Sequence, residues 1–123
     1  MFFKKKNKNP APKRHVEELT TELKHDLVQY YNGVTELDFA IYYQKEIYLH
    51  TTPKINLVSL GYHSARIEDL TEKYIELTEI TNLPETNKPL ATELIENGTL
   101  LLIKNEEKFT LFRQSILPLK LVK

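Results

Sequence analysis

Apolar and polar positions recur with two different periods along this chain. Val16, Leu19, Leu23 and Leu27 follow one another at spacings of three or four residues, which is typical of an amphipathic helix. Asn32-Gly33 comes directly after this stretch and predicts the end of the helix. From residue 34 onward the period changes to two, so we expect a sheet to follow the helix and to cover its apolar face.

The alternating part of the sequence predicts consecutive strands with short connections. Residues 37–43 and 46–51 alternate between apolar and polar side chains, and a turn at Gln44-Lys45 would join them as a hairpin. Pro53 predicts the end of the second strand. Residues 55–60 alternate again as far as Gly61, so they predict a third strand.

Shorter elements are predicted for the second half of the chain. Residues 62–83 carry both helical and alternating spacings, and we interpret them as a short helix or turn followed by a strand. Pro89 and Gly98 stand where the first turn and the exit of a short helix would be. The predicted elements are a helix or turn at 65–72, a strand at 73–80, a loop at 82–87, a helix at 89–96, a strand at 100–103 buried on both faces, a return strand at 109–113 and an edge strand at 119–122.

This order of elements predicts an α+β fold. The strands are mostly consecutive, which favours hairpin pairing over parallel crossovers. We therefore expect a small, strongly curved or pseudo-barrel sheet, antiparallel or mixed, with the N-terminal helix packed on it. A chain of 123 residues predicts one domain, here residues 15–123, preceded by a flexible basic arm at residues 1–14.

The arm holds charge of one sign only. Its six cations are Lys4, Lys5, Lys6, Lys8, Lys13 and Arg14, and no acid lies among them. The whole chain has 17 basic and 17 acidic residues, so 11 basic and 17 acidic residues remain for the body. An arm of this kind attracts polyanions such as RNA, DNA or anionic lipid. A solvated tail that aids solubility is the alternative.

Catalytic and metal-binding patterns are absent from the sequence. The chain has no cysteine and three glycines, which excludes thiolate sites and leaves no phosphate-binding loop. Its four histidines show no metal-ligand spacing, although His50 and His63 could meet in space. We therefore expect a non-enzymatic protein without a metal or another cofactor.

Tyrosines and cations are interleaved between residues 42 and 66, where Glu46 is the single acid. Tyrosine rings can stack on bases while nearby cations hold phosphates. The alternative is a tyrosine-rich sheet face packed under the helix. The candidate nucleic-acid-binding residues are Lys4, Lys5, Lys6, Lys8, Tyr42, Tyr43, Lys45, Tyr48, Lys54 and Arg66.

Residues 93–103, with the sequence ELIENGTLLLI, resemble the short helix, tight turn and buried strand of PUA-like barrels. The size of the chain, its leading helix and its cationic N-terminus also resemble the small PrgU-type regulators of conjugative plasmids. This resemblance implies a PUA-like pseudo-barrel and an RNA-facing regulator that limits expression of a transfer or surface-protein operon.

Three hypotheses for function follow. The first is a cytoplasmic, non-enzymatic RNA-binding regulator that controls a plasmid or mobile-element operon after transcription. The alternative is a protein-interaction module, such as an accessory or antitoxin-like partner, that would use a sheet edge or the acidic stretch at residues 67–107, which holds ten acids and three bases. A homodimer through an edge strand fits both hypotheses. The third is a membrane-surface protein, in which Phe2-Phe3 would insert beside the lysines.

Overall fold

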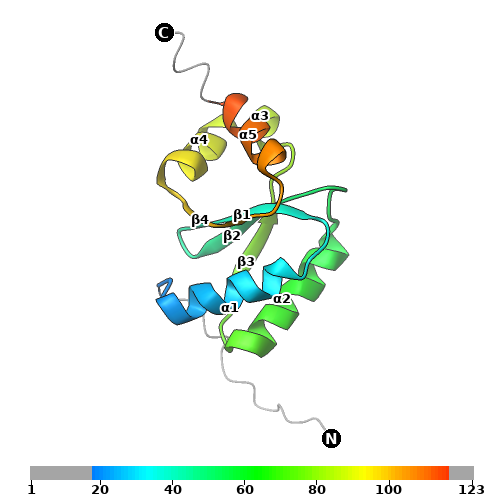
Figure 1. Cartoon of the computed structure of the whole chain (residues 1–123), viewed down its shortest axis with the longest axis vertical. Helices are drawn as coiled ribbons and strands as arrows, with labels where there is room; N and C mark the ends of the chain where they lie inside the picture. The colour runs from blue at the N-terminus through cyan, green and yellow to red at the C-terminus, as the bar shows by residue number, and fades with distance from the viewer. Residues whose placement is uncertain (1–17, 117–123) are drawn as a thin grey trace, which may run out of the picture.

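A four-stranded sheet with helices on both faces forms the centre of the molecule (Figure 1). The computed structural model describes residues 18–116. The strands lie in the order β3-β2-β1-β4, with α1 and α2 on one face and α3, α4 and α5 on the other. The strands are β1 (Leu37–Tyr43), β2 (Glu46–Thr51), β3 (Glu76–Glu79) and β4 (Thr99–Ile103), and the helices are α1 (Thr21–Asn32), α2 (Leu57–Thr71), α3 (Leu83–Thr86), α4 (Lys88–Asn97) and α5 (Glu106–Gln114).

The β1–β2 hairpin confirms the prediction from the alternating pattern. The strands pair antiparallel from Tyr43 opposite Glu46, and the two turn residues Gln44 and Lys45 both have positive φ, at 50° and 69°. Positive φ at both turn positions matches the right-handed twist of the strands on either side.

The sheet is mixed and open, which corrects the prediction of a pseudo-barrel. β1 pairs antiparallel with β2 and with β4, whereas β2 and β3 are parallel and joined by α2. β3 and β4 lie at opposite edges of the sheet and do not pair with each other, so the sheet does not close. The expected hairpin pairing is therefore wrong for β2 and β3, because a helix as long as α2 permits a parallel crossover.

Helix α1 ends where the sequence predicts but begins later than the apolar spacing suggests. Thr20 is the N-cap, and its Oγ1 accepts a hydrogen bond from the Leu23 amide at 3.1 Å. Gly33 is the C-cap, and Leu23, Leu27 and Tyr31 are the buried residues of the helix.

Helix α2 replaces the third strand that was predicted at residues 55–60. Asn56 caps the helix, because its side chain accepts a hydrogen bond from the Ser59 amide at 2.8 Å. Leu60 and Ile67 are buried seven residues apart, which is close to two helical turns. The second half of α2 corresponds to the short helix or turn predicted at 65–72. A short apolar run does not distinguish a strand from a helix, so the cap decides here.

The second half of the chain is partly as predicted. The strand expected at 73–80 is present as the shorter β3, and the predicted loop at 82–87 contains the single turn α3. Helix α4 and strand β4 confirm the helix and strand predicted at 89–96 and 100–103. β4 is an edge strand, however, and Thr99 and Leu100 are exposed, so the prediction of burial on both faces is wrong.

The return strand predicted at 109–113 is also wrong, because these residues belong to α5. Asn105 caps this helix by accepting a hydrogen bond from the Lys108 amide at 3.2 Å. Glu106 and Glu107 lie in its first turn, where the helix dipole favours acids. The predicted edge strand at 119–122 and the arm at 1–14 lie outside the described residues.

Two apolar clusters fill the spaces between the layers, one on each face of the sheet. Ala40 and Tyr42 belong to the cluster under α1 and α2, whereas Phe39 and Ile41 belong to the cluster under α4 and α5. β1 therefore contributes to both clusters, and its first six residues are all buried.

Candidate functional site

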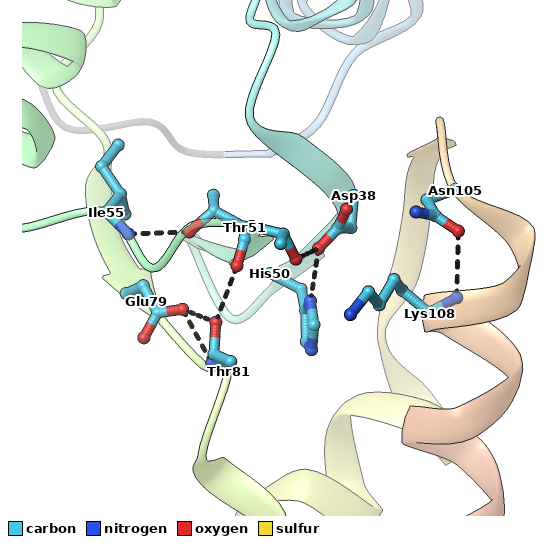
Figure 2. A network of polar contacts seen from close by, with 9 residues as sticks. Asp38, His50, Thr51, Ile55, Glu79, Thr81, Asn105 and Lys108 are labelled. Atoms are coloured by element: carbon cyan, nitrogen blue, oxygen red, sulfur yellow. Dashed lines mark hydrogen bonds and ion pairs between the residues drawn. The ribbon is translucent and has the colours of Figure 1, made fainter.

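A buried aspartate–histidine pair lies between β1 and β2 (Figure 2). The His50 Nδ1 lies 3.0 Å from Asp38 Oδ2, and the Thr52 hydroxyl donates to the same oxygen at 2.6 Å. Asp38 and His50 are only 4% and 8% exposed. Because a carboxylate can only accept, Nδ1 carries the hydrogen, and Nε2 of the neutral ring is left as an acceptor.

Aromatic rings enclose this histidine. The Phe39 ring stacks on His50 with the ring centroids 4.8 Å apart, and the Phe112 ring meets it edge-on at 5.8 Å. Burial lowers the pKa of His50, while the neighbouring Asp38 raises it and Lys108 lowers it. Figure 2 shows the Lys108 side chain extending from α5 towards the histidine ring. The pair joins β1 to β2 on the side of the sheet that α5 covers.

A second group of polar contacts lies at the C-terminal end of β2, next to His50. The Thr51 Oγ1 accepts a hydrogen bond from the Ile55 amide at 2.8 Å, and the Thr81 Oγ1 lies 3.3 Å from the Thr51 carbonyl oxygen. Thr81 also contacts the Glu79 carboxylate through its hydroxyl and its amide. Burial raises the pKa of Glu79. These contacts hold the chain beyond β3 against the end of β2 (Figure 2).

Three tyrosine–glutamate pairs gather where β1 ends and β2 and β3 begin. The Tyr43 hydroxyl donates to Glu93 at 2.7 Å, the Tyr48 hydroxyl to Glu46 at 2.8 Å, and the Tyr74 hydroxyl to Glu76 at 3.0 Å. We call this group the tyrosine–glutamate end; its members are Tyr43, Glu46, Tyr48, Tyr74, Glu76 and Glu93.

Charge is concentrated at the tyrosine–glutamate end. Glu46 and Glu76 are opposite each other on parallel strands. Burial and the hydrogen bond to Glu46 raise the pKa of Tyr48 well above its usual range, and the bond from Tyr43 lowers the pKa of Glu93. The tyrosines therefore remain protonated at neutral pH and act as hydrogen-bond donors.

An uncharged, exposed surface lies on the first half of α2. Leu57, Val58 and Tyr62 are 84%, 82% and 58% exposed. A methyl group added at Gly61 would meet nothing within 4 Å, which shows how open this surface is. Residues 57–65 include no Lys, Arg, Asp or Glu. We call this surface the α2 face; its members are Leu57, Val58, Gly61, Tyr62 and Ala65.

The candidate residues from the sequence do not form one surface. Tyr42 is buried in the cluster under α1 and α2, whereas Tyr48 is buried and Tyr43 half-buried on the opposite face of the sheet. Lys45 is exposed in the hairpin turn and Lys54 is exposed beyond β2. Arg66 is exposed on α2, with its guanidinium 5.8 Å from the centroid of the Tyr62 ring. Lys4, Lys5, Lys6 and Lys8 lie outside the described residues.

His50 and His63 occupy separate environments. His63 Nδ1 is 2.5 Å from the Tyr30 hydroxyl, at a cleft between α1 and α2, and burial lowers its pKa. Asp38 was not predicted as the partner of His50, because a bulge between Leu37 and Phe39 shifts the hairpin register. The exposed side of α2 was not predicted either, because residues 57–60 were assigned to a strand.

Residues 18–116 contain neither a cluster suited to a metal ion nor a helix suited to crossing a membrane. These residues contain no group of three histidine, cysteine, aspartate or glutamate side chains placed to hold a metal ion. None of the helices in this range is both long and apolar enough to cross a membrane.

Comparisons with known proteins give a likeness in fold. No protein-family model matches the sequence, and no curated protein is significantly similar to it. A crystal structure of the toxin–antitoxin MntA–HepT aligns with 84% of this chain and 89% of the matched chain, with a TM-score of 0.62 and 7% identity. A tri-AMPylated HEPN toxin from Shewanella oneidensis in complex with MNT antitoxin covers 82% and 87%, with a TM-score of 0.61 and 9% identity.

These likenesses correct three predictions. These two solved structures are toxin–antitoxin complexes, not PUA-like barrels or PrgU-type plasmid regulators. A toxin paired with an antitoxin protein contradicts the hypothesis of an RNA-binding regulator and fits the alternative of an antitoxin-like protein partner better. The prediction of a non-enzymatic protein is likewise overturned, because one of these complexes contains an AMPylated toxin.

Proposed function

We propose that this chain is the antitoxin-like member of a toxin–antitoxin pair and acts by binding a protein partner. The observation that supports the proposal is the likeness in fold to toxin–antitoxin structures, which extends over more than four fifths of the chain at TM-scores of 0.61 and 0.62. A likeness of this extent includes both layers of helices as well as the sheet.

The α2 face is the surface that fits a protein partner best. Contiguous exposed apolar side chains are uncommon on monomers and are typical of interaction sites. Leu57 and Val58 are more than four fifths exposed, and Tyr62 brings a large ring with a polar tip, the kind of residue that is enriched at interfaces. Charged residues are depleted at the centre of interfaces, and the α2 face has none.

Co-expression tests this proposal. The gene encoded beside this one is induced alone, with the parent chain, and with the variant Val58→Glu/Tyr62→Glu, and surviving colonies are counted. We expect the parent to restore growth and the variant to lose the protection, since two buried carboxylates would remain unpaired in the interface. Leu111→Glu is the matched control, because Leu111 is 53% exposed on α5, in the other layer.

Each outcome decides the proposal. Protection by the parent and by Leu111→Glu, but not by Val58→Glu/Tyr62→Glu, supports binding through the α2 face. A neighbouring product that is harmless, or two variants that protect equally well, would contradict it. Circular dichroism of the purified variants checks that both are folded.

Attachment of a nucleotide to the partner is a second candidate function. Glu46 and Glu76 favour it, because they are opposite each other on neighbouring strands and Mg²⁺ is usually bound by one or two carboxylates together with substrate phosphates. Glu46→Gln/Glu76→Gln separates the two candidates in the same assay. Loss of protection with partner binding retained would favour transfer, and full protection would favour binding alone.

A further inference from the structure

An apolar cleft with an acidic rim lies between α2 and the edge strand β3. Its volume is about 360 Å³, and Leu57, Leu60 and Leu77 supply its apolar side. Glu68 and Glu76 lie on its rim, and its described lining includes no lysine or arginine. β3 pairs with β2 alone within residues 18–116, so its outer backbone groups face this side of the molecule.

A second, smaller cleft lies where the described part of the chain begins. It has a volume of about 220 Å³ and contains three acids of the N-terminal region, Glu18, Glu22 and Asp26. Its other wall includes Thr71 and Lys73, and the next residue, Tyr74, already lines the first cleft. The connection between α2 and β3 therefore contributes residues to both clefts.

Residues 1–14 are chemically complementary to this pair of clefts. They carry six cations and no acid, and they begin with the apolar pair Phe2-Phe3. The two clefts together present five acids against the single cation Lys73. Opposite charges aligned in this way favour association and fix its direction.

The length of the segment also fits. Residues 1–17 join the described part of the chain at Glu18, which itself lines the smaller cleft. An extended chain spans about 3.3 Å per residue, so 15 residues reach about 50 Å, farther than a small domain is wide. A segment of this length that joins at Glu18 is therefore long enough to reach both clefts.

We propose that the basic N-terminal segment, residues 1–14, docks in the cleft between α2 and β3 of its own chain. Its cations pair with Glu18, Glu22 and Asp26 and then with Glu68 and Glu76, and Phe2-Phe3 packs on Leu57, Leu60 and Leu77. This contact assigns the segment a binding site on the protein itself, and because Leu57 also belongs to the α2 face, the docked segment would cover part of the surface proposed for a protein partner.

Amide chemical shifts of the full-length protein test the proposal. Spectra of the parent are compared with those of the full-length variant Lys4→Glu/Lys5→Glu/Lys6→Glu/Lys8→Glu, in low and in high salt. We expect the differences to gather at residues 57–68 and 74–77, and added salt to move the parent towards the variant, because exposed ion pairs are screened. Coincident spectra at these residues would overturn the proposal.

A synthetic peptide of residues 1–14 provides the second test. Added to the lysine-to-glutamate variant, it should shift the same amides in the same direction. Glu68→Lys/Glu76→Lys should lower the affinity of the protein for the peptide by about tenfold or more, as expected for the loss of two ion pairs. Glu85→Lys/Glu107→Lys is the matched control, with two exposed acids on α3 and α5, and equal weakening by both pairs would contradict the site.

Concentration separates docking within one chain from docking between two copies. Shifts of the parent that are unchanged over a hundredfold dilution, with a monomeric mass in sedimentation, support the contact within the chain. Shifts that fade on dilution while a dimer dissociates would mean that the segment of a second copy occupies the cleft, which overturns the proposal as stated.

Discussion

His50 shows how one side chain can make the stability of the protein depend on pH. Its ring lies between Phe39 and Phe112, and burial lowers its pKa even though Asp38 is beside it. Burial lowers the pKa of His63 as well. A histidine whose pKa is lower in the folded state than in the unfolded state stabilises the fold fully only above the unfolded value, near 6.5.

We therefore expect the free energy of unfolding to fall as the pH is lowered from about 7.5 to about 5.5, because the unfolded chain takes up protons on these histidines first. His50→Gln should reduce this dependence on pH, since the amide keeps a donor towards Asp38 but does not titrate. Urea unfolding of the parent and the variant at both pH values measures the two slopes.

His63→Gln is the comparison for this prediction. It should also make the free energy of unfolding less dependent on pH, independently of the effect of His50→Gln. Burial raises the pKa of Glu79, so this group acts in the opposite sense: it stabilises the fold at low pH and the contribution is lost as the pH rises through its raised pKa. A parent slope equal to that of His50→Gln would contradict the role given to His50.

At the level of the elements, two glycines differ in whether the structure has room for a side chain in their place. Gly98 joins α4 to β4, and a methyl group there would lie 2.5 Å from both the Ile41 Cγ2 and the Leu94 carbonyl oxygen. Gly61 lies inside α2, where a methyl group would meet nothing within 4 Å. One glycine is required for the close approach of helix and sheet, and the other weakens its helix without a packing reason.

Gly98→Ala is expected to lower the free energy of unfolding by about 1–3 kcal/mol, the usual range for overpacking. Gly61→Ala is expected to raise it by about 0.5–1 kcal/mol, the difference between glycine and alanine inside a helix. Urea unfolding of both variants tests the pair, and changes of the same sign would contradict the packing described here.

The elements that the sequence predicts well are those whose pattern is local. The hairpin follows from alternation on both sides of Gln44-Lys45, and α4 follows from Pro89 and Gly98. α5 and the first half of α2 were missed because their apolar residues also fit strands, while the caps Asn56 and Asn105 resemble ordinary loop residues.

The candidate sites were harder to predict because they depend on which elements become neighbours. Glu46 and Glu76 are 30 positions apart and meet only through the parallel pairing of β2 and β3. Asp38 and His50 meet through the hairpin register, which a bulge between Leu37 and Phe39 shifts by one residue. The exposed side of α2 could not be predicted while its first residues were assigned to a strand.

The whole molecule consists of two helical layers that share one sheet. Leu27 of α1 and Leu94 of α4 are almost fully buried in different clusters, yet both clusters include side chains of β1. Neither layer can therefore separate from the sheet without exposing the side of β1 that it covers.

We accordingly expect one cooperative unfolding transition for both layers. Leu27→Ala and Leu94→Ala should each lower the free energy of unfolding by about 2–5 kcal/mol, as cavities in a core do. In each variant the midpoints from far-ultraviolet circular dichroism and from tyrosine fluorescence should coincide. A variant in which the two probes separate would show that the layers unfold independently.

The burial of β1 also restricts where new properties can arise in this architecture. Six consecutive residues of the strand, Leu37 to Tyr42, are buried. A substitution there alters packing before it can alter recognition, so changes of specificity have to arise at the rim: the strand ends, the two outer strands and the outward sides of the helices. Related chains could thus acquire different partners while keeping an unchanged central strand.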